Sequence, residues 1–199
     1  MLYSVVVIGT SWGGLTAMTS LFAALPDDFP IPIVIVQHRS KDSDRLLSQL
    51  LQDKTALKVC EIEDKDPLKG GTIHVAPANY HVMLESGYLS LTIEEPVRYS
   101  RPSIDVMFDS AADTYGPAAI GIILTGANED GARGLASIAR RGGRALVQDP
   151  KSAEIPIMPE AALRAVPAAE KLTLDKMAER LIELSREELK PRRGRTATV

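Results

Sequence analysis

The feature that most constrains the fold is a repeated alternation of short β-branched apolar runs with longer segments of helical periodicity. The first run, Val5–Ile8, is followed by apolar residues at spacings of three and four up to Pro26, and the run Ile33–Val36 comes next. Apolar runs without polar alternation are typical of parallel strands covered on both faces, and the longer spacing indicates amphipathic helices. The pattern predicts a doubly wound α/β fold, a Rossmann-like arrangement of three layers in which helices cover both faces of a mostly parallel sheet.

The middle of the chain departs from this alternation. Three short runs, Thr72–Ala76, His81–Glu85 and Tyr88–Ile93, follow one another with turn residues between them. Such close spacing predicts antiparallel strands, so we expect a small antiparallel excursion at an edge of the sheet. The alternation then resumes, with helices expected from Ser103, over Ala132–Arg140, after Pro159 and from Thr173, and strands expected over Ala118–Leu124 and Ala145–Val147.

Length and composition limit the number of domains and the classes of partner. A chain of 199 residues suits one domain, expected over residues 1–189, followed by a basic, disordered tail over residues 190–199. The formal net charge of −3 supplies no basic field for a nucleic-acid backbone, and the lone Cys60 excludes an intrachain disulfide. The first apolar run ends at Gly9, far short of the roughly 20 residues that span a membrane. We therefore expect a cytoplasmic protein without membrane insertion.

The turn after the first strand is the first position where chemistry is expected. Gly9, Ser11 and Gly13 fit the pattern G-x-S-x-G, a sharp strand-to-helix turn that exposes a serine hydroxyl. The helix that begins there presents free N–H groups suited to an oxyanion. A dinucleotide fingerprint would need glycine in place of Ser11, and a P-loop would need lysine in place of Leu15. Taken alone, the turn is equally well a glycine-rich helix start that Ser11 caps.

A histidine follows the second strand of the predicted sheet. His38 comes directly after the run that begins at Ile33, and a right-handed crossover places such a strand beside or near the first one. A base there can take the proton of Ser11 and so activate its hydroxyl. The rival bases, His74 and His81, lie in the short strands of the middle segment rather than at the mouth of the parallel sheet.

A carboxylate that orients the histidine is expected in the loop after the strand Ile120–Thr125. Glu129 and Asp130 both qualify by chemistry, and Asp130 is equally well a helix N-cap. Serine, histidine and acid each follow a strand end where this fold gathers side chains, so the pattern predicts a serine hydrolase with the chain order Ser, His, Asp. We expect Asp130→Asn to leave folding nearly intact and to reduce turnover severely.

In these residues the sequence resembles the catalytic domain of the chemotaxis protein-glutamate methylesterases, the CheB family. The resemblance runs from Val5 to Leu184 and is carried by Ile8–Gly14, Ile35–His38, Ile73–Pro77, Arg101–Asp105, Leu124–Gly126, Asp130–Gly131, Gln148 and Met158–Pro159. It implies that Ser11 is the nucleophile, His38 the general base and Asp130 the orienting acid. It also implies hydrolysis of γ-methyl glutamate esters on the helical cytoplasmic domain of chemoreceptors, with release of methanol and without a metal or organic cofactor. Many relatives also deamidate receptor glutamines.

The sequence departs from the family pattern in three places. Family members commonly carry a receiver domain before this one, whereas here the first strand begins by residue 5, so we expect control by a separate response regulator or kinase. The acid loop, usually Gly-Met-Gly-x-Asp-Gly, has Ala127 and Asn128 at its second and third positions, and asparagine tolerates a positive φ. Trp12 follows the serine where a smaller residue is usual. We expect backbone N–H groups of Trp12 and of the Gly126–Asn128 loop to hold the oxyanion.

Two other functions stay open on the sequence. One is a carboxylesterase or amidase of different substrate range, which would cleave small esters and ignore methylated receptor. The other is a non-catalytic module whose glycine-rich helix N-terminus binds an anion or a partner's carboxylate. Such a module would be stabilised by anions and would not turn over esters.

Overall fold

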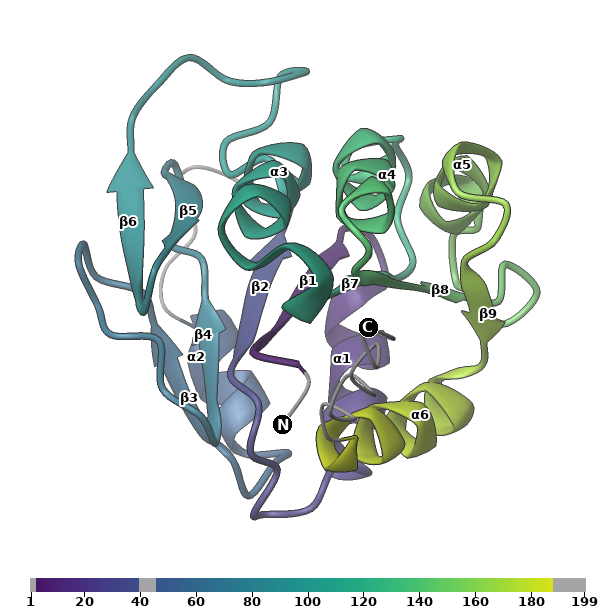
Figure 1. Ribbon diagram of the computed structural model, residues 1–199, viewed down its shortest axis with the longest axis horizontal. Helices are drawn as coiled ribbons and strands as arrows, with labels where there is room; N and C mark the ends of the chain where they lie inside the picture. The colour runs from purple at the N-terminus through teal and green to yellow at the C-terminus, as the bar shows by residue number, and fades with distance from the viewer. Residues whose placement is uncertain (1–2, 40–45, 188–199) are drawn as a thin grey trace, which may run out of the picture.

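The protein is described by a computed structural model that covers residues 3–39 and 46–187. A seven-stranded parallel sheet in the order β3-β4-β2-β1-β7-β8-β9 forms its centre, and a separate two-stranded antiparallel hairpin, β5-β6, stands beside it (Figure 1). The expected doubly wound α/β fold is confirmed. The strands are β1 (Val5–Thr10), β2 (Ile33–Gln37), β3 (Lys58–Glu61), β4 (Thr72–Val75), β5 (His81–Glu85), β6 (Tyr88–Thr92), β7 (Ala119–Ile123), β8 (Arg144–Gln148) and β9 (Glu170–Leu172).

Helices cover both faces of the sheet. In Figure 1, α3, α4 and α5 stand in a row on one side, and α1, α2 and α6 lie on the other. The helices are α1 (Gly14–Ala23), α2 (Leu46–Gln52), α3 (Ile104–Tyr115), α4 (Ala132–Arg140), α5 (Ile157–Ala165) and α6 (Leu174–Arg186), with a short 3₁₀ turn at Gly116–Ala118. The basic tail expected over residues 190–199 lies outside the described residues.

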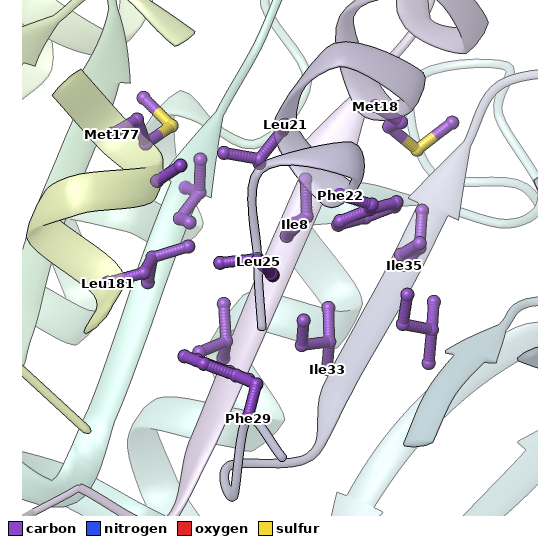
Figure 2. Close-up of a cluster of buried hydrophobic side chains, with 14 of the residues drawn as sticks. Ile8, Met18, Leu21, Phe22, Leu25, Phe29, Ile33, Ile35, Met177 and Leu181 are labelled. Carbon is purple, nitrogen blue, oxygen red and sulfur yellow. The ribbon is translucent and has the colours of Figure 1, made fainter. Parts of the chain in front are cut away.

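The sheet separates two apolar cores because β1, β2 and β7 are apolar on both faces. On one face, Phe22 of α1 packs with Ile8 and Ile35 of the central strands, and Met177 and the neighbouring apolar side chains of α6 complete the cluster (Figure 2). The core on the other face is closed by α3, α4 and α5. All residues of β1 are buried, as expected of a central parallel strand.

One expected strand arrangement is wrong. Thr72–Ala76 does not belong to an antiparallel excursion: β4 lies inside the parallel sheet, where Ile73 pairs with Ile33 on one side and Val59 on the other. The chain from β3 to β4 crosses over through a loop without a helix, so the helical segment that normally signals a parallel connection is missing from the sequence. Only His81–Glu85 and Tyr88–Thr92 form the antiparallel pair.

The order of the strands fixes where loops converge. From β1 the chain builds outward through β2, and it later returns to pair β7 with the other side of β1. The register places Thr10 opposite Gln37 and Gly9 opposite Ile123, so the residues after these strands lie next to one another. Such a reversal of strand order opens a crevice at the carboxyl ends of the strands.

Within the described ranges, no helix is both long and apolar enough to cross a bilayer.

The N-termini of α3 and α4 are capped by each other's carboxylates. Asp105, in the first turn of α3, accepts hydrogen bonds from the backbone N–H groups of Gly131 (3.0 Å) and Gly134 (2.8 Å) at the start of α4. Asp130, just before α4, accepts from the N–H groups of Ile104 (2.7 Å) and Asp105 (3.0 Å) at the start of α3. The first turns of helices leave N–H groups without intrahelical partners, so each carboxylate satisfies donors that would otherwise be buried and unpaired.

The helices α3 and α4 pack closely where their carboxylates cap each other's N-termini. Gly131 has φ +93°, and a Cβ there would lie 2.5 Å from Cγ2 of Ile104. A Cβ on Gly134 would lie 2.5 Å from Cβ of Phe108. Glycine therefore lets the two helices approach closely enough for the carboxylates to reach across.

We predict that Asp105→Ala lowers the free energy of unfolding by about 2–5 kcal/mol, because two buried N–H groups lose their acceptor. Asp109→Ala is the matched control, since Asp109 also pairs with Arg133 but sits on the outside of α3; its loss should cost less than about 1 kcal/mol. Urea unfolding of the two variants measures the difference. Equal losses would contradict the capping role of Asp105.

Candidate active site

The sheet brings Ser11 and His38 to one edge. Ser11 follows β1 and its backbone N–H donates to Thr125 O (3.0 Å) after β7, and His38 follows β2 and its N–H donates to Thr10 O (3.1 Å). Both residues line two adjoining hollows of about 520 and 370 Å³. The register of three neighbouring strands thus places the expected serine and histidine side by side at one opening.

Ser11 lies on a tight turn and is not a helix cap. The N-cap of α1 is Gly13, which has φ +77° and no side-chain capping bond. A Cβ at Gly13 would lie 2.8 Å from Cβ of Glu154, so the turn needs glycine on grounds of both conformation and space. Within the described part of the chain, no hydrogen bond joins the Ser11 hydroxyl to His38.

His38 is held from both ring nitrogens. Its Nε2 lies 2.8 Å from Oδ2 of Asp130, and its Nδ1 lies 3.0 Å from Nδ2 of Asn128. The imidazole is 13 % exposed and the Asp130 carboxylate 2 %. The histidine therefore forms the boundary between the buried acid and the open hollow.

Asp130 is a buried carboxylate that only accepts hydrogen bonds. Besides His38 and the two N–H groups of α3, its Oδ1 accepts from the hydroxyl of Ser103 (3.0 Å). Burial raises the pKa of Asp130, but the hydrogen bonds from His38, Ile104 and Asp105 outweigh it, so the pKa is lowered overall. The ionised carboxylate is thus the form that this environment favours.

Asp130, and not Glu129, contacts the histidine. Glu129 points to the surface, where it forms an ion pair with Arg164 at 3.0 Å, and its side chain is 59 % exposed. Of the two carboxylates that the sequence left open, the structure brings only Asp130 to His38.

The two rival histidines are buried away from the hollows. His81 accepts from the backbone N–H of Ser103 at Nδ1 (3.1 Å) and contacts Glu95 O through Nε2 (3.2 Å). His74 lies in β4, 3.6 Å from the sulfur of Cys60, and burial lowers its pKa. Both bridge secondary-structure elements, which is the structural role expected of most buried histidines.

The groups expected to hold an oxyanion are only partly available. The N–H of Gly126 donates to Ile155 O (3.1 Å), so it cannot serve. The N–H groups of Trp12, Ala127 and Asn128 have no partner among the described residues. The positive φ considered for Asn128 is absent.

The Trp12 side chain does not close the site. The ring is 67 % exposed, and its Nε1 donates to Oε1 of Glu154 at 3.1 Å. It therefore forms part of the rim beside Ser11.

Another wall of the larger hollow is formed by the loop that contains Tyr99 and Arg101, which the sequence analysis did not assign to the site. Arg101 fastens this segment by donating to Asn79 Oδ1 (2.8 Å) and to the carbonyl oxygens of Ile93 (2.8 Å) and Glu94 (3.0 Å). Tyr99 projects fully from it and lines the larger hollow. The segment Arg101–Asp105 carried part of the resemblance, which was the one available signal for this wall and for Asp105.

Among the described residues, no group of three or more His, Cys, Asp or Glu side chains is arranged to hold a metal ion. At the two hollows the structure gathers the Ser11 hydroxyl and the His38 imidazole, with the Asp130 carboxylate behind the histidine.

The chain is similar in sequence to a known family and to several of its members. The sequence model of the family described as CheB methylesterase matches residues 6–181. A putative protein-glutamate methylesterase/protein-glutamine glutaminase of Leptospira interrogans is 46 % identical over 193 residues, which cover 96 % of this chain and all of that protein. The protein-glutamate methylesterase FrzG of Myxococcus xanthus is 37 % identical over 182 residues, covering 91 % of this chain and 54 % of its own length.

A solved structure has the same fold. The crystal structure of the Thermotoga maritima CheB methylesterase catalytic domain superimposes with a TM-score of 0.88 at 32 % identity, covering 92 % of this chain and 98 % of that one. The family model matches most of the chain, and the relative from Leptospira interrogans is covered along its whole length. Both findings assign the chain to the same family. This chain belongs to the CheB methylesterase family.

Proposed function

We propose that this chain hydrolyses methyl esters of glutamate side chains in proteins, with Ser11 as nucleophile, His38 as general base and Asp130 as the acid that orients it. The observation that carries the proposal is the 2.8 Å contact between His38 Nε2 and Asp130 Oδ2 at the wall of a hollow that Ser11 also lines. The names of the relatives from Leptospira interrogans and Myxococcus xanthus support this reaction class.

The contacts of His38 determine which of its ring nitrogens accepts the proton of the Ser11 hydroxyl. Because Nε2 faces the Asp130 carboxylate, Nδ1 is the nitrogen that takes the Ser11 proton. Oγ of Ser11 then bonds to the ester carbonyl carbon, and the π electrons move to the carbonyl oxygen. The imidazolium is stabilised by the ionised Asp130.

The developing oxyanion needs donors at the rim. We assign this role to the N–H groups of Trp12 and of the Ala127–Asn128 segment, because they have no partner among the described residues. One such donor typically contributes about 2.7–4 kcal/mol to stabilising the transition state. When the carbonyl re-forms, the methoxy group leaves and takes the proton from Nδ1 as methanol. Water then attacks the glutamyl ester of Ser11, His38 takes and returns a proton, and a glutamate carboxyl group is released.

The same steps convert glutamine to glutamate, with ammonia as the leaving group in place of methanol. The name of the relative from Leptospira interrogans includes this glutaminase activity. We therefore propose deamidation as a second reaction of the same three side chains.

The proposed substrate is the helical cytoplasmic domain of a methylated chemoreceptor, which places the reaction in the cytoplasm. The open rim formed by Trp12 and the loop around Tyr99 suits a protein surface better than an enclosed pocket would, because both side chains are exposed. Control by a separate response regulator or kinase stays part of the proposal.

We predict that Ser11→Ala abolishes fluorophosphonate labelling and lowers methanol release from methylated receptor by more than about 10³-fold. Ser103→Ala is the matched control, because the Ser103 hydroxyl contacts Asp130 but lies buried and outside the hollows. The adduct in that variant should still map to Ser11. Labelling at any other residue, or turnover by Ser11→Ala, would overturn the assignment.

We predict that Asp130→Asn lowers turnover by roughly 10³- to 10⁴-fold and also lowers the free energy of unfolding at pH 7 by about 2–4 kcal/mol. The second effect revises the expectation of nearly intact folding, because an amide nitrogen cannot accept from the donors that surround the carboxylate.

The stability difference should depend on pH. The pKa of Asp130 is lower in the folded chain than in the unfolded one, so its contribution is present above the unfolded pKa and is lost as pH falls through the folded pKa. Urea unfolding from pH 7 to pH 3 should show the gap between wild type and Asp130→Asn narrowing below about pH 4. A gap that stays constant with pH would contradict an ionised Asp130.

A further inference from the structure

The contacts of the Asn128 side chain fix which end of its amide faces His38 in this structure. Its Oδ1 accepts a hydrogen bond from the backbone N–H of Asp130 at 3.1 Å. The other end of the amide, Nδ2, consequently faces Nδ1 of His38 at 3.0 Å. An amide nitrogen only donates, so this contact requires an unprotonated Nδ1 on the histidine.

The contacts of His38 therefore assign a single tautomer. Nε2 carries the proton and donates it to Asp130 Oδ2, and Nδ1 carries the lone pair. That lone pair is the one that takes the Ser11 proton in the proposed reaction, yet it is already occupied by the Asn128 amide. The absence of a bond from the Ser11 hydroxyl to His38 among the described residues agrees with this occupancy.

We propose that Asn128 is a positioning residue that holds His38 in a resting state: its amide occupies the base lone pair until the side chain turns away, and only then can Ser11 reach it. The inference rests on the proposed function of Ser11 and His38. Asn128 lines the same hollow that a substrate side chain would enter, so an entering substrate meets the amide directly.

Two variants separate this role from a merely structural one. Asn128→Ser keeps an acceptor for the Asp130 N–H, since serine makes the same local turn, but it removes the amide that reaches His38. Asn128→Asp keeps the shape and the acceptor but puts a carboxylate oxygen where the amide donor was, which favours a proton on Nδ1.

We expect opposite effects on the second-order rate constant for labelling Ser11 with a fluorophosphonate. Asn128→Ser should raise it by about 2- to 12-fold, the factor that corresponds to the net loss of one competing neutral hydrogen bond. Asn128→Asp should lower it. If Asn128 only supported the loop, Asn128→Ser would leave the rate constant unchanged or reduce it, and either result in a variant that unfolds at the wild-type temperature overturns the proposal.

Nitrogen NMR of the His38 ring supplies a readout that does not depend on activity. Wild type and Asn128→Ser should both show a proton on Nε2 and none on Nδ1, and Asn128→Asp should show a proton on Nδ1 as well. A wild-type ring protonated at Nδ1 overturns the inference. Failure of Ser11 to react in every variant, with the expected ring signals present, would instead reject the proposed function and leave the Asn128 contact established.

Discussion

The exchange of carboxylates between α3 and α4 is the interaction on which the site depends. Asp105 satisfies the first N–H groups of α4, and Asp130 satisfies those of α3. The N-terminus of α3 carries partial positive charge, and the hydrogen bonds that it donates contribute to the lowered pKa of Asp130 despite burial. Because these donors occupy most of the acceptor positions of Asp130, the one direction left is toward His38. The Asp130 side chain therefore both caps the N-terminus of α3 and contacts His38.

The sequence predicted the parts of the architecture that depend on strand ends. Ser11 and His38 each follow an apolar run, and in a parallel sheet such positions converge whatever the details of packing. The β-α-β pattern predicted that the two strand ends lie near one another, and the structure confirms this with Thr10 opposite Gln37. The position of β4 could not, because a crossover that is a loop looks like a meander in the sequence.

The side-chain contacts of the site were harder to predict from the sequence than its strand ends, because they depend on residues that are distant along the chain. Asp105 reads as an ordinary first-turn acid of a helix, and nothing local signals that it also caps a second helix. Glu129 and Asp130 are neighbours of equal chemistry, and only the start of α4 determines which of them turns inward. For Asn128 the sequence raised the question of backbone conformation, whereas its side-chain amide is what meets His38.

The site consequently divides into a rigid half and an open half. Asp130 is buried and accepts from two backbone N–H groups at the start of α3, so the acid that contacts His38 is anchored to that helix. Ser11 lies instead on a turn bordered by the exposed Trp12. A buried acid fixes the ring without limiting what enters the hollow, while the exposed rim can vary without unfolding the core. In the function we propose, this division lets the Ser11, His38 and Asp130 arrangement stay fixed while the residues of the exposed rim vary.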